Sequence, residues 1–435
     1  MEKHYKLKCR VCESLFEDDG LRLACPHAHA PSLLSTQYSS RSFEPDDSAP
    51  GIYRYHRWLP GSHRLQMTTG SITYQSQKLN AVLDLPNLWI AFSGYWPERG
   101  ARLETATFKE LEVCGVLSRM PTNGMRALVV ASAGNTAAAF ARACSENEIP
   151  CLIVVPVAGM KKLRFSRPLN ACVKIVCVTG GAAYSDAISL AEQIARHDGF
   201  VGEGGVKNVG RRDGMGIAML NAVEAIGRLP DYYFQAIGSG AGAIAAHEAA
   251  KRLIADGRFG NTVPRLMLSQ NLPFTPIHNS WKRGSRELIE SDTQQGRDLT
   301  EKILATVLSN QHPPYSIAGG MFDVLTESKG DMFAVRNEDV VQASRLFETC
   351  EGIDIDPAAG VALASLIKSA RSGLINREGV VLLHITGGGA RRRAVDQDLV
   401  PASPNCEITL RQLESGKAIE LACALFAKKH SCQPA

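Results

Sequence analysis

The sequence predicts an α/β fold with two doubly wound parallel-sheet domains and an N-terminal cap segment. Three features support this fold class: short, almost fully apolar runs, longer segments of helical periodicity between them, and glycine-rich turns where a run leads into a helix. Strands that are apolar throughout are typical of parallel sheets covered by helices on both faces. Ligands in such sheets bind beyond the carboxyl ends of the strands.

The expected elements alternate along the chain from residue 70 onward. Strands are expected at 88–92, 127–130, 152–155, 174–178, 233–237, 266–269 and 380–385. Helices are expected at 136–148, 184–196 and 241–255, with one amphipathic helix at 410–428. We expect five parts: a Cys/His-containing cap (1–62), a larger domain in two pieces (63–107 and 206–400), a small mobile domain (108–205), and a C-terminal helix and tail (401–435).

Composition favours a globular enzyme in a reducing, cytoplasmic compartment. The 435 residues allow two or three packed units, and 45% of them are hydrophobic. The net charge of +4 and the lack of a Lys/Arg block argue against nucleic-acid binding. The sequence has no apolar run long enough for a membrane span, and we expect no signal peptide. Most of the 12 cysteines lie singly in apolar runs, which favours buried thiols over disulfides.

Three strand-to-helix loops are candidates for binding an anion. They are residues 132–136 (SAGNT), 238–242 (GSGAG) and 386–389 (TGGG). A glycine-rich turn at a helix N-terminus presents backbone N–H groups and the positive end of the helix dipole, which suits a phosphate. One such loop alone is more often a tight turn, but three in one chain favour a phosphate-containing ligand.

Lys109 is the candidate nucleophile. It follows Phe108 in the run T-A-T-F-K-E and begins a helical segment. Most lysines are solvated surface charges, whereas a lysine that is partly desolvated near helix N-termini can form a Schiff base. The residues alone leave both interpretations open.

The order of these motifs resembles the fold-type II enzymes that depend on pyridoxal 5′-phosphate (PLP), in their threonine synthase branch. The matching motifs are T-x-[ST]-F-K, S-x-G-N-T-A-A-A, G-S-G-x-G and T-G-G-G, between about residues 69 and 393. This resemblance implies that Lys109 carries PLP, that Asn135 contacts its phenolic oxygen and that Thr386 meets its ring nitrogen. It also assigns the PLP phosphate to the backbone of Gly238, Ser239, Gly240, Ala241 and Gly242.

A longer set of motifs resembles the cysteate synthases, which are relatives of threonine synthase. It includes the N-terminal C-x-x-C and C-P-H-x-H, S-G-Y-W-P-E-R-G and G-G-V-K-N-V-G-R-R-D-G-M-G, and spans about residues 8–393. The resemblance implies β-replacement on O-phospho-L-serine: phosphate leaves to give a bound aminoacrylate, and sulfite adds to give L-cysteate, on a route to coenzyme M. Lys109 then also acts as general acid and base.

A phosphorylated substrate and an anionic nucleophile require cationic groups. Asn208 and Arg211 match the N-x-x-R that threonine synthases use for their substrate phosphate, and Lys207 lies beside them. A solvated basic turn is the alternative interpretation. The residues expected to face the substrate carboxylate are Thr107, Ser132, Gly134 and Thr136.

Departures from the threonine synthase pattern leave the reaction open. Where those enzymes have P-T-G-S-F-K, this chain has Glu104, Ala106 and Thr107, and an inward Glu104 would repel a substrate phosphate. The alternatives are threonine synthase, a phosphoserine-dependent β-replacement enzyme with another nucleophile, and a PLP-family binding protein without catalysis. The intact Lys109 and Asn135 argue against the last. The resemblance also implies a homo-oligomer.

The N-terminal cysteines and histidines match the ligand types of a tetrahedral zinc site. The expected ligands are Cys9, Cys12, Cys25 and His27, or His29 in place of His27. The C-x-x-C spacing is that of a zinc ribbon, but C-x-H and C-x-x-x-H are poorer second halves than C-x-x-C. The sequence is compatible with two interpretations of this cluster, a structural zinc site and a cap without metal. His384 is isolated, so we expect it to have a core or surface role.

Overall fold

The computed structural model describes residues 4–67, 69–121, 127–132, 134–289 and 293–426. The chain divides into two compact units, one formed by Met1–Thr122 and Gly204–Asp398 and the other by Asn123–Glu203 and Leu399–Ala435. Each unit contains its own largely parallel sheet, and the α/β class predicted from the sequence is confirmed. None of the helices in the described ranges is long and apolar enough to cross a lipid bilayer.

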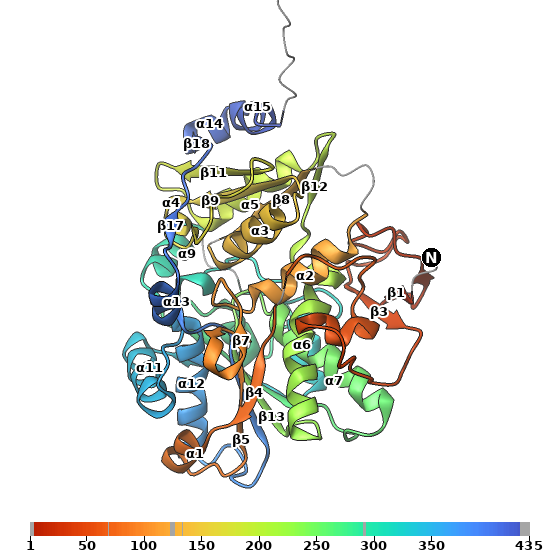
Figure 1. The fold of residues 1–435 in the computed structure, drawn as a ribbon, viewed down its shortest axis with the longest axis vertical. Helices are drawn as coiled ribbons and strands as arrows, with labels where there is room; N and C mark the ends of the chain where they lie inside the picture. The colour runs from red at the N-terminus through yellow and green to blue at the C-terminus, as the bar shows by residue number, and fades with distance from the viewer. Residues whose placement is uncertain (1–3, 68, 122–126, 133, 290–292, 427–435) are drawn as a thin grey trace, which may run out of the picture. The chain divides into compact units, whose positions relative to one another are not determined.

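The first unit is built on a six-stranded sheet of order β15-β14-β13-β16-β5-β4, in which β4 pairs antiparallel and the other strands pair parallel. Its strands are β4 (Ile72–Gln75), β5 (Leu88–Phe92), β13 (Tyr232–Ala236), β14 (Arg265–Asn271), β15 (Asp331–Val335) and β16 (Val381–Ile385). The apolar runs form these strands because both faces of the sheet are covered. Helices α11 and α12 lie on one side and α6 and α7 on the other (Figure 1).

Helices and short strands complete the first unit. The helices are α1 (Gln77–Leu83), α2 (Lys109–Arg119), α6 (Val209–Ile226), α7 (Ala241–Asp256), α8 (Pro276–Lys282), α9 (Thr293–Glu301), α10 (Met321–Glu327), α11 (Asn337–Glu351), α12 (Pro357–Arg371) and α13 (Ala390–Asp396). The 3-10 helices are η1 (Gly51–Trp58), η2 (Pro97–Arg99), η3 (Gly205–Lys207) and η4 (Thr306–Leu308). The hairpin β6 (Tyr95–Trp96) and β7 (Ala101–Arg102) precedes the turn that leads into α2.

Helices α2 and α6 pack with their backbones in direct contact. A Cβ added to Gly115 would lie 2.0 Å from the carbonyl oxygen of Gly210, and one added to Gly214 would lie 2.2 Å from that of Leu111. Only glycine fits at such a close approach. This contact brings the side chains of the first turns of α2 and α6 together.

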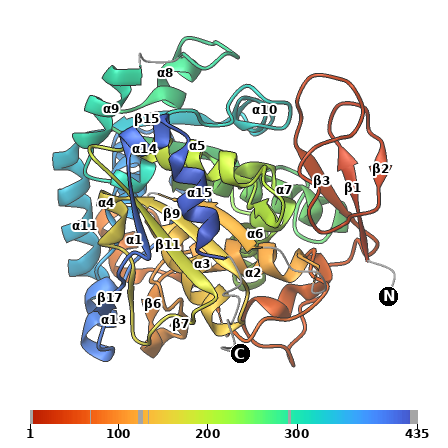
Figure 2. The same cartoon turned by 90° about the horizontal axis from the view of Figure 1, so that it is seen from above.

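The N-terminal segment forms a small antiparallel sheet of order β2-β1-β3. Its strands are β1 (Tyr5–Cys9), β2 (Leu15–Phe16) and β3 (Leu34–Tyr38). Figure 2 shows these strands gathered at one edge of the first unit. The sheet is tied to α6 by hydrogen bonds from Thr36 and Tyr38 to the buried carboxylate of Asp213, at 2.6 and 2.7 Å.

The second unit contains a five-stranded, fully parallel sheet of order β12-β8-β9-β11-β18. Its strands are β8 (Ala127–Ala131), β9 (Cys151–Pro156), β11 (Val173–Thr179), β12 (Phe200–Gly202) and β18 (Cys406–Thr409), with the short pair β10 (Arg164–Phe165) and β17 (Val400–Pro401). Its helices are α3 (Asn135–Glu146), α4 (Val157–Met160), α5 (Tyr184–Ile194), α14 (Leu410–Glu414) and α15 (Lys417–Ala424). Helices α5 and α15 pack on one apolar face of the sheet.

Two expectations about chain organisation differ from the structure. The single helix expected at 410–428 is wrong, because Gly416 adopts a left-handed conformation (φ +75°) that ends α14 and allows α15 to start in a new direction. Helix α2 belongs to the first unit, whereas we expected residues 108–122 in the small domain. Its packing against α6 is the physical reason.

Candidate active site

The turn before α2 places Lys109 as the first residue of that helix. Ala106 adopts a left-handed conformation (φ +58°) at the position where the threonine synthase motif has glycine. The fully buried carboxylate of Glu110 holds this turn by accepting hydrogen bonds from the backbone N–H of Thr105 and from its hydroxyl, the latter at 2.7 Å. The Glu110 carboxyl therefore holds the turn in place. The Lys109 side chain that follows is 21% exposed.

A buried carboxylate links Lys109 to an arginine of α6. The Nζ atom of Lys109 lies 2.9 Å from Oε2 of Glu112, whose side chain is 0% exposed. The Nη1 atom of Arg211, with a side chain 9% exposed, lies 3.2 Å from the same carboxylate. Charges this deeply buried are stable only when they are paired. The two cations therefore share one anion at the contact between α2 and α6.

The loop after β16 lies against the Lys109 turn. Thr107 forms an antiparallel bridge with Gly387, and the N–H of Phe108 donates to the carbonyl of Thr386 at 2.9 Å. The Thr107 hydroxyl is buried, and Oγ1 has no hydrogen-bond partner within the part of the chain that the structure describes. A buried hydroxyl without a protein partner is available to a ligand or to water. Thr107, Lys109 and Thr386 are thus brought together in one unit.

The glycine-rich loop 238–242 reaches the same place through Phe108. Gly240 caps the start of α7 in a left-handed conformation (φ +82°). A Cβ on Gly242 would lie 3.0 Å from the Phe108 ring and 2.5 Å from Nε2 of Gln235, so the first turn of α7 packs directly on the residue before Lys109. The first N–H groups of a helix have no intrahelical partner and suit a phosphate. This loop fits the phosphate of a cofactor held near Lys109.

The buried His384 contacts Phe108, the residue before Lys109. His384 is 1% exposed and contacts the hydroxyls of Ser93 (3.0 Å) and Tyr233 (2.7 Å), while its ring meets the Phe108 ring edge-on at 5.4 Å. Burial lowers the pKa of His384 to about 3, because a charged imidazole would lose its hydration there. Of the core and surface roles left open for His384, the structure shows the core role.

The residues predicted to bind the substrate phosphate occupy different environments. The side-chain oxygen of Asn208 caps α6 by accepting from the N–H of Gly210 (2.9 Å), and it also accepts from Arg119 (3.0 Å). The Asn208 oxygen is therefore engaged within the protein. Lys207 is exposed on η3, whereas Arg211 is buried beside Glu112. Among these three residues, Arg211 is connected to Lys109 through their shared partner Glu112.

The loop 132–136 belongs to the second unit, where it connects β8 to α3. Gly134 is the N-cap of α3 at φ +143°, and its N–H donates to the Ser132 hydroxyl at 3.0 Å. Ser132 and Thr136 are buried, and Asn135 is half-buried as the first residue of the helix. The roles of these four residues toward cofactor and substrate stay predictions.

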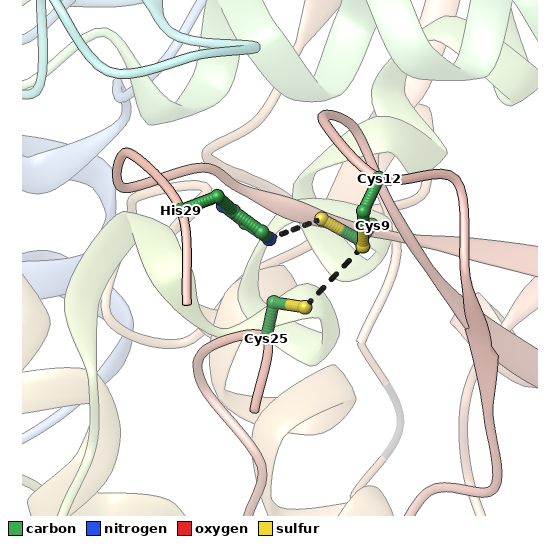
Figure 3. Close-up of side chains that lie close together, drawn as sticks. All are labelled: Cys9, Cys12, Cys25 and His29. Atoms are coloured by element: carbon green, nitrogen blue, oxygen red, sulfur yellow. Dashed lines mark hydrogen bonds between the residues drawn. The ribbon is translucent and has the colours of Figure 1, made fainter. Parts of the chain in front are cut away.

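The Cys/His cluster lies apart from Lys109 in sequence, at the end of β1 and in the segments that connect the strands of the N-terminal sheet. Four ligand atoms, from Cys9, Cys12, Cys25 and His29, lie within 4.8 Å of one another (Figure 3). His27 is outside this group of four; its ring packs edge-on against Phe16 at 5.5 Å, and its Nδ1 lies 3.5 Å from the Cys12 sulfur. The structure therefore brings together three of the predicted ligands with His29 as the fourth.

Sequence reasoning missed Glu112 and the role of Phe108. The signal for Glu112 was available, since residues three apart on a helix are neighbours and Lys109 and Glu112 have that spacing. The packing of Phe108 between α7 and His384 joins segments more than 100 residues apart, which periodicity does not reveal.

Comparison with known proteins shows the family of the chain. Residues 96–387 match the family described as pyridoxal-phosphate dependent enzyme. The chain is 44% identical to the cysteate synthase of Methanoculleus marisnigri over 96% of both proteins, and 43% identical to that of Methanosarcina barkeri over 94% of this chain and 99% of the relative. The cysteate synthase of Methanosphaerula palustris is 45% identical over 92% of this chain and 93% of the relative.

Solved structures share the fold at low sequence identity. Threonine deaminase isoform 2 from Solanum lycopersicum has a TM-score of 0.57 at 14% identity, covering 85% of this chain and 97% of that one. Maize serine racemase has a TM-score of 0.55 at 15% identity, covering 81% and 93%. At these identities the likeness establishes the fold alone.

Proposed function

Because the chain belongs to the cysteate synthase family of pyridoxal-phosphate-dependent enzymes, we propose that it replaces the phosphate of O-phospho-L-serine with sulfite. The products are L-cysteate and inorganic phosphate. The observation that carries this proposal is the buried Lys109–Glu112–Arg211 contact, which gives one site a proton-transfer group and a cation.

The first unit provides groups that fit PLP. We propose that Lys109 holds its aldehyde carbon, that the 238–242 loop holds its phosphate, and that Thr386 meets its ring nitrogen. We propose that Asn135 also contacts the cofactor. When bound, PLP stabilises negative charge at the substrate Cα, which allows a group to leave from Cβ. Two observations support this position of PLP. The buried Thr107 hydroxyl has no hydrogen-bond partner among the described residues, and the start of α7 packs on Phe108.

Lys109 and Glu112 form the proton-transfer pair in this proposal. The amine of Lys109 removes the Cα proton of the substrate and later returns a proton to the product. The Glu112 carboxylate accepts a hydrogen bond from the amine at 2.9 Å. Glu112 thus positions the Lys109 amine for proton transfer.

Arg211 supplies the cation for the two anionic reactants. Its charge is compensated in part by Glu112 and is buried, so an anion in contact with it would be poorly screened by water. The proposed ligands of Arg211 are the phosphate group of O-phospho-L-serine and sulfite. We propose that Ser132, Gly134 and Thr136 bind the substrate carboxylate, and that the enzyme is a homo-oligomer.

The test uses the full chain loaded with PLP. O-phospho-L-serine is added alone, with sulfite or with sulfide; phosphate release is measured, and products are identified by mass. Cysteate formed with sulfite supports the proposal. Phosphate release without cysteate would exclude sulfite as the nucleophile, and absence of phosphate release would exclude O-phospho-L-serine. Threonine formed from O-phosphohomoserine in a parallel reaction would favour a threonine synthase instead.

A further inference from the structure

The N-terminal cluster has the dimensions of a tetrahedral metal site. The sulfur atoms of Cys12 and Cys25 lie 3.7 Å apart, and the sulfur of Cys9 lies 3.4 Å from Nε2 of His29. Around a tetrahedral zinc ion with the usual bond lengths, two sulfurs are about 3.8 Å apart and a sulfur and a nitrogen about 3.6 Å. All four side chains point toward one centre (Figure 3). None of these cysteines is in a disulfide.

The tautomer of His29 is fixed in the form that binds a metal. Its Nδ1 lies 2.7 Å from the carbonyl oxygen of Ala30, so Nδ1 carries the hydrogen and donates it. Nε2 is then left with a free lone pair on the side of the Cys9 sulfur. A ligating histidine typically donates its other ring N–H to such an acceptor. His27 has no such arrangement, because its Nδ1 lies 3.4 Å from the Ser14 hydroxyl and 3.5 Å from the Cys12 sulfur.

Backbone and hydroxyl donors surround the sulfurs. The N–H of Val11 donates to the sulfur of Cys9 at 3.4 Å, and the N–H of His27 donates to the sulfur of Cys25 at 3.5 Å. The Ser32 hydroxyl lies 3.2 Å from the sulfur of Cys9. Hydrogen bonds to the ligand atoms are the outer layer of contacts that orients the ligands in protein metal sites. The sulfurs of Cys9 and Cys25 have such contacts.

We propose that Cys9, Cys12, Cys25 and His29 bind one structural Zn²⁺ ion. Three thiolates and an imidazole suit zinc, and four protein ligands complete its tetrahedron, so no position is left open for a substrate or water. This inference does not depend on the reaction proposed above.

The segment that carries the four proposed ligands contacts the elements that shape the cofactor loop. Arg10, between two ligands, pairs with Glu248 of α7 at 3.2 Å, and Glu248 pairs with Arg212 of α6 at 2.9 Å. Just beyond His29, Ser32 forms a parallel bridge with Ala318, three residues before Met321. A Cβ on Gly240 would lie 2.3 Å from the Met321 sulfur, so this segment packs on the 238–242 loop. Losing the metal should therefore weaken cofactor binding as well as stability.

The experiment measures metal content in the full PLP-loaded chain, purified without chelator and with reduced thiols. Elemental analysis is expected to find one zinc per chain. His29→Gln and Cys25→Ser should each lose it, and the thermal midpoint should fall by about 5 °C or more. His27→Gln is the matched control and should keep the zinc. Zinc well below one per chain in the wild type, or loss in His27→Gln but not in His29→Gln, would overturn the proposal.

A second measurement keeps the proposal testable if the variants fail to fold. Wild-type chain depleted of metal is loaded with Co²⁺, and its visible spectrum is recorded. Intense d–d bands of tetrahedral cobalt with sulfur-to-cobalt charge transfer would support three thiolates and one nitrogen. A spectrum of octahedral cobalt, or a spectrum that Co²⁺ leaves unchanged, would contradict it.

Discussion

The buried imidazole of His384 predicts an acid-sensitive first unit. Its pKa is lowered by burial to about 3 in the folded chain, whereas an exposed histidine titrates near pH 6.5. Below about pH 6.5 the unfolded chain therefore binds a proton that the folded chain does not. The contribution of the neutral His384 to the free energy of unfolding is therefore fully present above that pH and is lost as the pH falls toward 3.

The size of the loss follows from these two pKa values. Between pH 7 and pH 5 the unfolded histidine goes from mostly neutral to almost fully charged, while the folded one stays neutral. Linkage gives a loss of about 2 kcal/mol in the free energy of unfolding from this residue alone. Other groups titrate over the same interval, so the contribution of His384 has to be obtained by difference.

Urea unfolding of the wild type and of His384→Gln isolates that difference. Glutamine keeps a donor and an acceptor for Ser93 and Tyr233 but does not titrate. Fluorescence is the appropriate probe because the four tryptophans all lie in the first unit: Trp58, Trp89, Trp96 and Trp281. We expect the variant to lose about 2 kcal/mol less than the wild type between pH 7 and pH 5. Equal losses in both proteins would refute the buried, neutral histidine.

Three further substitutions test the site. Glu112→Gln should lower kcat about 10-fold or more, since the amine of Lys109 loses the anion at 2.9 Å; an unchanged kcat at normal cofactor content would contradict this role. Arg211→Ala should raise KM for O-phospho-L-serine about 10- to 100-fold, as expected for a lost charged hydrogen bond, and an unchanged KM would remove Arg211 from the substrate site. Asn208→Ala should lower the free energy of unfolding by about 1–2 kcal/mol in urea, because its side chain caps α6; stability equal to wild type would refute the cap.

The sequence was sufficient for the inner strands of the two large sheets because these strands are apolar on both faces; the edge strands β4, β12, β15 and β18 were not expected. Runs such as 88–92 and 152–155 have no amphipathic alternative, and the structure makes both of them strands. The two-residue strand β2 and the late strand β18 carry too few apolar residues to stand out. Gly416 could have been recognised as a helix end, since glycine commonly ends a helix in the left-handed conformation.

The candidate site was predictable only where a motif is local. Lys109 and the 238–242 loop are marked by their neighbours in sequence, and the structure joins them through Phe108. The choice between His27 and His29 depends on which ring nitrogen finds a carbonyl, a tertiary contact that spacing does not specify. Asn208 matches a phosphate-binding motif, yet its oxygen is used as a helix cap. The N-x-x-R motif of residues 208–211 is compatible with both a phosphate-binding asparagine and a helix-capping one.

The claim on which the whole account depends is that Lys109 carries the cofactor, and borohydride reduction tests it most directly. Reduction makes the link between PLP and its lysine permanent, so digestion and mass spectrometry identify the modified residue. We predict one phosphopyridoxyl group per chain, on the peptide that contains Lys109, and none in Lys109→Ala. The modification of a different lysine, with Lys109 unmodified, would contradict the account.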